Sequence, residues 1–154
     1  MNEDDRGIFR VVTHGTFELD GGSWEVDNNI WLVGDEREVV AIDAAHDAAQ
    51  ILDADAVLRV DGVELRAVHT LGHSPGSTCL YAPVLDAVFS GDTLFRGGPG
   101  ATGRSYWDFP TILSSISQRL GKLREHTTVY TGHGESTTIG DELAHYDEWV
   151  ARGH

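Results

Sequence analysis

Short apolar runs separated by turn-forming residues make up most of the chain before residue 91. Their length, their β-branched and aromatic residues, and the Gly, Pro and Asp residues that bound them are typical of β-strands. The runs that we expect to be strands are Ile8–Thr13, Trp24–Val26, Asn29–Val33, Glu38–Ile42, Val57–Val60, Val63–Val68, Ser77–Ala82 and Ala87–Ser90. Asp61-Gly62 separates two of these runs and predicts a two-residue hairpin turn of type I′.

A helical period replaces this pattern after residue 107. Asp108 as N-cap and Pro110 in the first turn predict the start of a helix, and an apolar stripe follows on one side of it. The stripe consists of Ile112, Leu113, Ile116, Leu120 and Leu123. A last strand over Thr127–Thr131 and a terminal helix over Asp141–Ala151 are expected beyond it. A short helix is also predicted over His46–Leu52.

The order of these elements indicates the fold class. A strand-rich first half followed by strands mixed with helices suits layered sheets covered by helices, an α/β (α+β) arrangement. The length of 154 residues and the hydrophobic content of 40% suit one globular domain over residues 1–154. Residues 1–7, which are acidic and precede the first apolar run, are expected to form a disordered tail.

Metal-capable side chains follow three of the predicted strands. The loop His69-Thr-Leu-Gly-His73-Ser-Pro-Gly-Ser77 lies between two strands, and its glycines and proline shape a sharp polar turn. Ser90-Gly-Asp92-Thr93 and Thr131-Gly-His133-Gly134 repeat this arrangement, with an apolar strand that ends in glycine and one metal-capable residue. Three strand-end loops that offer His, Asp and His indicate a ligand set spread over the sequence and gathered in space.

The motifs Leu71-Gly-His-Ser-Pro-Gly-Ser77, Phe89-Ser-Gly-Asp-Thr-Leu-Phe95 and Thr131-Gly-His-Gly134, in this order, resemble the metallo-β-lactamase superfamily. Its glyoxalase II-like thioester hydrolases are the most similar branch. The resemblance extends from about Val26 to the end of the chain. It implies an αββα sandwich with the functional site at one edge, between the two sheets.

The resemblance also implies roles for individual residues. His73 matches a ligand of the first metal position, Asp92 the carboxylate that bridges both metals and serves catalysis, and His133 the histidine of the second position. Asp43 matches an acid that braces the site from behind its ligands, with a strand-terminal cap as the alternative. His69 is a further candidate for such a supporting role, and a hydrogen bond within its own loop is the alternative.

One family motif is missing from this sequence. Members of the family carry a His-x-His-x-Asp-His loop that supplies most of the first metal position and part of the second, and no such pattern occurs here. The corresponding region runs from Ile42 through His46 directly into Val57–Val60. A helix–strand–loop unit is therefore missing from the N-terminal half by comparison with the family. We expect exposed apolar surface and reduced stability there.

The family reaction is hydrolysis of a thioester or ester by metal-bound hydroxide, with a small acyl compound as substrate. Loss of the main metal loop predicts impaired activity and one divalent ion at most, zinc first and iron as the alternative. A non-catalytic family member, acting as a binding module or as a shortened product, is the second hypothesis. Chemistry like that of the non-haem iron sulfur dioxygenases of this superfamily is the third, since two histidines and a carboxylate also suit iron.

Composition narrows the partners further. The chain has 25 acidic and 11 basic residues, and a net charge of −14 disfavours nucleic acid and anionic membranes as partners. Cys79, the single cysteine, excludes an internal disulfide, suits a reducing compartment and is expected to be a small buried residue. The acidic start Met-Asn-Glu-Asp-Asp lacks the apolar core of a secretory signal, so we expect a cytoplasmic location. The oligomeric state is not indicated.

Overall fold

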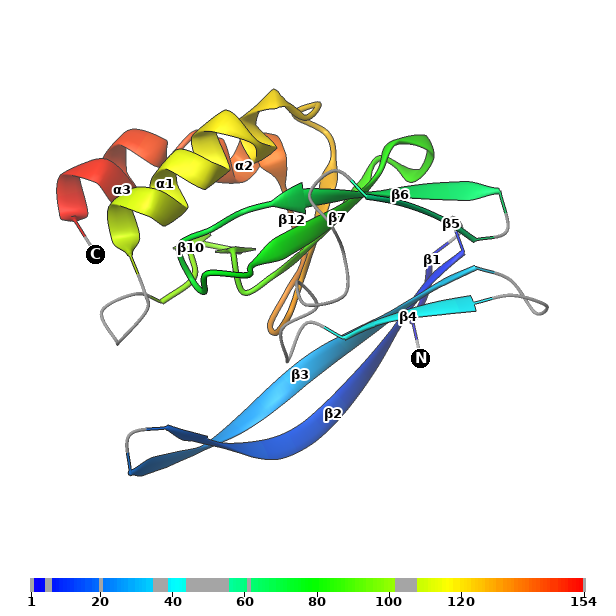
Figure 1. The fold of residues 1–154 in the computed structure, drawn as a ribbon, viewed down its shortest axis with the longest axis horizontal. Helices are drawn as coiled ribbons and strands as arrows, with labels where there is room; N and C mark the ends of the chain where they lie inside the picture. Colours follow the sequence, from blue (N-terminus) through cyan, green and yellow to red (C-terminus); the bar gives the residue numbers. More distant parts are fainter. Residues whose placement is uncertain are drawn as a thin grey trace.

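The computed structural model describes residues 2–4, 7–19, 21–34, 39–43, 56–60, 62–101 and 108–153. Among these residues, two β-sheets pack face to face, and helices cover the outer face of one of them (Figure 1). The first sheet has the order β1-β2-β3-β4, with β1 at Asn2–Asp4, β2 at Ile8–Leu19, β3 at Gly22–Gly34 and β4 at Val39–Asp43. All of its pairings are antiparallel.

The second sheet has the order β12-β11-β8-β7-β6-β5. Its strands are β5 at Val57–Val60, β6 at Val63–His69, β7 at Thr78–Ala82, β8 at Ala87–Gly91, β11 at Thr128–Thr131 and β12 at Thr137–Thr138. The predicted hairpin at Gly62 is confirmed, because Val60 pairs with Val63 across the turn. A small pair, β9 at Leu94–Phe95 and β10 at Gly98–Pro99, lies between β8 and α1, where the sequence pattern predicted no strand.

The β2–β3 hairpin is longer than the sequence pattern predicted. Strands were expected over Ile8–Thr13 and, separately, over Trp24–Val26 and Asn29–Val33, whereas the pairing runs without a break from Ile8↔Val33 to Leu19↔Gly22. Its outer half extends beyond the sandwich (Figure 1). Polar Asp27 and Asn28 divide the apolar positions of β3 into two short runs, which is why the sequence pattern predicted two strands in place of one.

Residues 1–7 were predicted to be a disordered tail, and this is wrong for Asn2–Asp4. These residues form β1 and pair with β2 in the register Asn2↔Arg10 and Asp4↔Ile8. The prediction of a tail was based on acidic composition, which gives no information on backbone hydrogen bonds at the edge of a sheet.

The helices pack on the second sheet. They are α1 at Phe109–Gln118, α2 at Ile139–Leu143 and α3 at Tyr146–Arg152, with short 3-10 turns η2 at Pro83–Leu85 and η3 at Leu120–Lys122. Asp108 is the N-cap residue of α1, as predicted, but α1 ends before Leu120, which is buried from η3 instead. The predicted terminal helix is two helices. The carbonyl of His145 accepts the backbone N–H groups of Glu148 and Trp149, which starts α3 and lets the Trp149 side chain enter the core.

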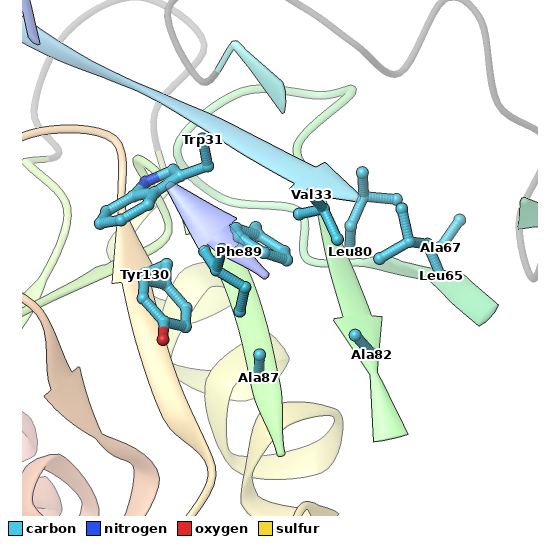
Figure 2. Close-up of a cluster of buried hydrophobic side chains, with 10 residues drawn as sticks. Trp31, Val33, Leu65, Ala67, Leu80, Ala82, Ala87, Phe89 and Tyr130 are labelled. Atoms are coloured by element: carbon cyan, nitrogen blue, oxygen red, sulfur yellow. The ribbon is translucent and has the colours of Figure 1, made fainter. Parts of the chain in front are cut away.

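Two apolar clusters hold these layers together. Between the sheets, Trp31 of β3 packs on Tyr130 and Phe89, with ring centroids 4.6 and 6.4 Å apart (Figure 2). Between the second sheet and the helices, the buried side chains include Cys79, Val88, Leu94, Ile112, Ile116, Leu120, Val129, Ile139 and Trp149. Burial in both clusters is the main stabilising contribution to the fold.

The α/β class and the sandwich of two sheets are confirmed. Among the described residues, helices lie on the outer face of the second sheet only (Figure 1). The predicted helix over His46–Leu52 lies outside the described residues. On the outer face of the first sheet, Phe9 pairs with Leu32 and Val11 with Ile30, and all four side chains are half-buried. In the described part of the chain, no helix is both long and apolar enough to cross a membrane.

Candidate metal centre

Strand direction brings the three sequence motifs to one edge of the second sheet. β11 runs parallel to β8, and β6 runs parallel to β8 because both are antiparallel to β7. The carboxyl ends of these three strands therefore meet at one edge. His73, Asp92 and His133 each follow one of these ends.

The three side chains converge there. Nε2 of His73 lies 3.5 Å from Oδ2 of Asp92, and Nε2 of His133 lies 3.8 Å from Oδ1 of the same carboxylate. The His73 side chain is 21% exposed, Asp92 32% and His133 53%. Asp92 thus presents one oxygen to each imidazole from the middle of the group.

His73 is oriented by its other ring nitrogen. Nδ1 lies 3.2 Å from the carbonyl oxygen of Ala101, which can only accept, so Nδ1 donates its hydrogen there and Nε2 is the ring nitrogen that faces Asp92. The loop around His73 is anchored to α1, because the carbonyl of Gly72 accepts the N–H of Asp108 at 2.8 Å. Gly72 is at φ +132°, and a Cβ there would overlap the backbone of Ile112.

A buried polar cluster beneath the site joins the loops of His73 and Asp92. The hydroxyls of Thr70 and Thr93 lie 2.9 Å apart, and Thr70 also contacts Sγ of Cys79 at 3.2 Å. All three residues are buried. The Thr70–Thr93 contact fixes the spacing of the two loops, and Gly100 lets the chain pass so close that a Cβ there would overlap the carbonyl oxygen of Asp92.

Burial controls the electrostatics of Asp92. Desolvation raises the pKa of its carboxyl above the usual range, while the positive charges of His73 and His133 act in the opposite direction. A carboxylate that is desolvated beside two imidazoles is well suited to a cation, which would compensate its charge.

His133 rests against an aromatic ring. The imidazole stacks on Phe95, with centroids 4.1 Å apart and planes at 26°. The turn after Phe95 is held by the buried Glu142 of α2, whose carboxylate accepts the N–H of Gly97 at 2.9 Å and the hydroxyl of Thr137 at 2.7 Å. Sequence reasoning missed both contacts, since stacking partners and buried carboxylates from another element leave no local signal.

The remaining candidates have less clear positions. His69 ends β6 on the same side as Ala67, facing the first sheet, and its Nε2 is buried with no hydrogen-bond partner in the described structure. Asp43 ends β4 opposite Ile30, and only its backbone is described. His46 and residues 102–107 lie outside the described residues.

Imidazole nitrogens and carboxylate oxygens are suitable ligands for a divalent cation. Few of them are available at this site in the described structure. Ligand atoms at about 2.1 Å from a tetrahedral ion lie about 3.4 Å apart, close to the His73–Asp92 separation. The two imidazoles approach different oxygens, however, so each would serve a different metal position. Accordingly, no group of three His, Cys, Asp or Glu side chains in the described ranges is close enough to hold one ion. Each position has one imidazole and one carboxylate oxygen.

Comparison with known proteins identifies the class. The family model described as the metallo-beta-lactamase superfamily matches residues 51–133, more than half of the chain. The chain therefore belongs to the metallo-β-lactamase superfamily, in agreement with the three motifs at one sheet edge.

Individual relatives refine this picture. The chain is 40% identical over 102 residues to the probable metallo-hydrolase YqgX of Bacillus subtilis, covering 66% of this chain and 46% of that protein. It is 37% identical over 86 residues to the hydroxyacylglutathione hydrolase GloC of Haemophilus influenzae, covering 56% and 41%. The solved structure of TTHA1623 in a di-iron-bound form is 37% identical with a TM-score of 0.53, covering 60% and 44%. The chain spans about half the length of the curated relatives it matches.

Cys79 provides a test of the packing beneath the site. It is fully buried, and burial raises the pKa of its thiol to about 11. At pH 8 we therefore expect about one thousandth of the thiol as thiolate and no reaction of the folded protein with Ellman's reagent. Labelling in denaturant should reach one thiol per chain. Rapid labelling of the folded protein would show that the Thr70–Thr93–Cys79 cluster opens to solvent.

Proposed function

We propose that this chain hydrolyses a thioester or a related acyl ester with the help of a divalent metal ion. The observation that carries the proposal is the placement of Asp92, which offers a separate carboxylate oxygen to His73 and to His133. The similarity to GloC, named as a hydroxyacylglutathione hydrolase, supports a thioester as substrate class. Zinc suits the imidazole and carboxylate donors, and the di-iron form of TTHA1623 supports iron as the alternative.

The residues of the chain have defined tasks in this proposal. When bound, a divalent ion supplies a water of lowered pKa and polarises a carbonyl group. Asp92 holds its place between the two imidazoles and provides the negative charge that such an ion requires. The Nδ1–H···O=C bond to Ala101 fixes the ring orientation of His73, and the Phe95 ring supports that of His133. With one imidazole at each position, we propose weak metal binding and low turnover.

A second candidate is a non-catalytic member of the superfamily. It is favoured by one specific observation, the shortage of ligands around either oxygen of Asp92 in the described structure. In this case the fold would serve binding rather than turnover.

A hydrolysis assay separates the two. Metal-free protein is loaded with zinc or with iron under anaerobic conditions, metal content is verified, and cleavage of a hydroxyacylglutathione thioester is followed. We expect slow hydrolysis that chelator stops and that His73→Ala removes. The matched control is His126→Ala, since His126 is exposed near Asp86 at the opposite end of β11. No turnover with metal verifiably bound would contradict the hydrolase and support the non-catalytic candidate.

A further inference from the structure

The buried side chain of Asn29, from the opposite sheet, binds the turn that carries His133 on both sides of this histidine. Asn29 of β3 is 3% exposed and lies between the two sheets. Its Nδ2 donates to the carbonyl of Thr131 at 3.0 Å and to that of Gly134 at 3.1 Å. Its backbone N–H donates to the carbonyl of Gly132 at 2.6 Å. We propose that Asn29 is a positioning residue that fixes His133 at the candidate metal centre.

The turn itself explains why such support is needed. β11 follows β8 regularly up to Tyr130, and the register shifts at Thr131 as the chain leaves the sheet. In the turn that follows, Thr131 and Gly132 are buried, where a carbonyl without a partner is unfavourable, whereas His133 and Gly134 are exposed. The Asn29 side chain binds the carbonyls of Thr131 and Gly134, the backbone N–H of the same residue binds that of Gly132, and the hydroxyl of Thr131 binds that of His133 at 2.7 Å.

Two other side chains each support one end of this turn, and neither binds it on both sides of His133. Nε1 of Trp31 donates to Thr131 at 2.9 Å, which lies before His133, and Arg10 reaches Gly134 only at 3.4 Å. Asn29 binds on both sides of His133, and both hydrogens of its amide are used. Without this side chain, Thr131 keeps the bond from Trp31 and Gly132 keeps the backbone bond from residue 29, so the loss falls mainly on Gly134, directly after His133. The backbone pairing of β3 with β2 and β4 remains.

The stack on Phe95 gives a direct readout of where His133 lies. A ring at 4.1 Å shields the imidazole protons, so their resonances should lie upfield of those of the exposed histidines. The resonance is assigned with His133→Gln, and Phe95→Leu defines its unshielded position. A purely structural role of Asn29 would alter the melting temperature without changing this shift in the folded protein.

The experiment compares Asn29→Ala with Asn28→Ala, both metal-free. Asn28 is the adjacent residue of β3, and its side chain lies on the opposite face of the strand. We expect the His133 resonance to move to the unshielded position in Asn29→Ala and to stay shielded in Asn28→Ala, with the methyl resonances of Val33 and Leu65 unchanged in both. Zinc affinity should fall about 10- to 100-fold in Asn29→Ala alone.

A shielded His133 in folded Asn29→Ala would overturn the inference. If this variant does not fold, Asn29→Ser, which keeps one donor, takes its place with the same criterion. The wild type gives an independent check, because both side-chain amide protons of Asn29 should exchange slowly with water, and fast exchange would contradict the proposal.

The inference rests on the proposed function only in treating His133 as a metal ligand. Failure of wild-type zinc binding would remove that function, whereas the metal-free shift decides positioning by itself.

Discussion

Replacing Asp92 with asparagine removes divalent-metal binding and any metal-dependent hydrolysis. The amide keeps the size of the side chain but loses the charge that both metal positions share, so neither imidazole retains an anionic neighbour. Loss of a residue that only supports a metal ligand lowers affinity by about 10- to 100-fold. Because Asp92 is itself a proposed ligand, we expect zinc affinity and turnover to fall by at least about 100-fold. Calorimetric titration with zinc and the thioester assay measure both effects.

The same variant should gain stability when no metal is present. Burial raises the pKa of Asp92 in the folded protein above its unfolded value, so the stabilising contribution is present at low pH and is lost as the pH rises through the folded pKa. The raised pKa means that the ionised carboxylate is less favourable in the folded than in the unfolded protein, and Asp92→Asn removes this cost. We expect a higher melting temperature than wild type in chelator, whereas exposed Asp147→Asn should show little change. A lower melting temperature for Asp92→Asn would contradict this account of its burial.

Replacing Gly72 with alanine should disrupt the anchoring of the His73 loop. Gly72 is at φ +132°, and a Cβ there overlaps the backbone of Ile112 in α1, which is part of a packed helix. Backbone strain and overpacking together should lower the free energy of unfolding by about 3–5 kcal/mol. Denaturant unfolding gives this value from the shift of the midpoint at constant m.

Gly15→Ala is the matched control for this prediction. Gly15 lies in β2 without a positive φ, and a Cβ there meets nothing within 4 Å. We expect its free energy of unfolding to stay within about 0.5 kcal/mol of wild type. Equal stabilities for the two variants would show that the Gly72 loop does not pack against α1 in solution.

Local sequence signals predicted the parts of the fold that local chemistry determines. The hairpin at Gly62 and the start of α1 after Asp108 were predicted and are confirmed. The outer part of the β2–β3 hairpin and the break between α2 and α3 were not. Polar Asp27 and Asn28 interrupt the apolar pattern of β3, and the break between the helices is set by the place where Trp149 enters the core.

The candidate site shows the same division. His73, Asp92 and His133 were predicted from motifs, because a glycine-shaped loop after a strand leaves a recognisable pattern. Asn29 and Glu142, which hold the neighbouring turns, lie far away in sequence and were missed. A buried Asn or Glu has a meaning only once its partner is known, and the partners here are backbone groups of other elements.

The most direct test of the account is a zinc titration of the metal-free protein by isothermal titration calorimetry. We predict one zinc per chain with a dissociation constant of about micromolar, weaker than a site with four protein ligands because each position has one imidazole. Binding should be lost in Asp92→Asn and weakened in His73→Ala and His133→Ala. Absence of binding at millimolar zinc, or binding that Asp92→Asn leaves unchanged, would contradict a metal centre built on Asp92.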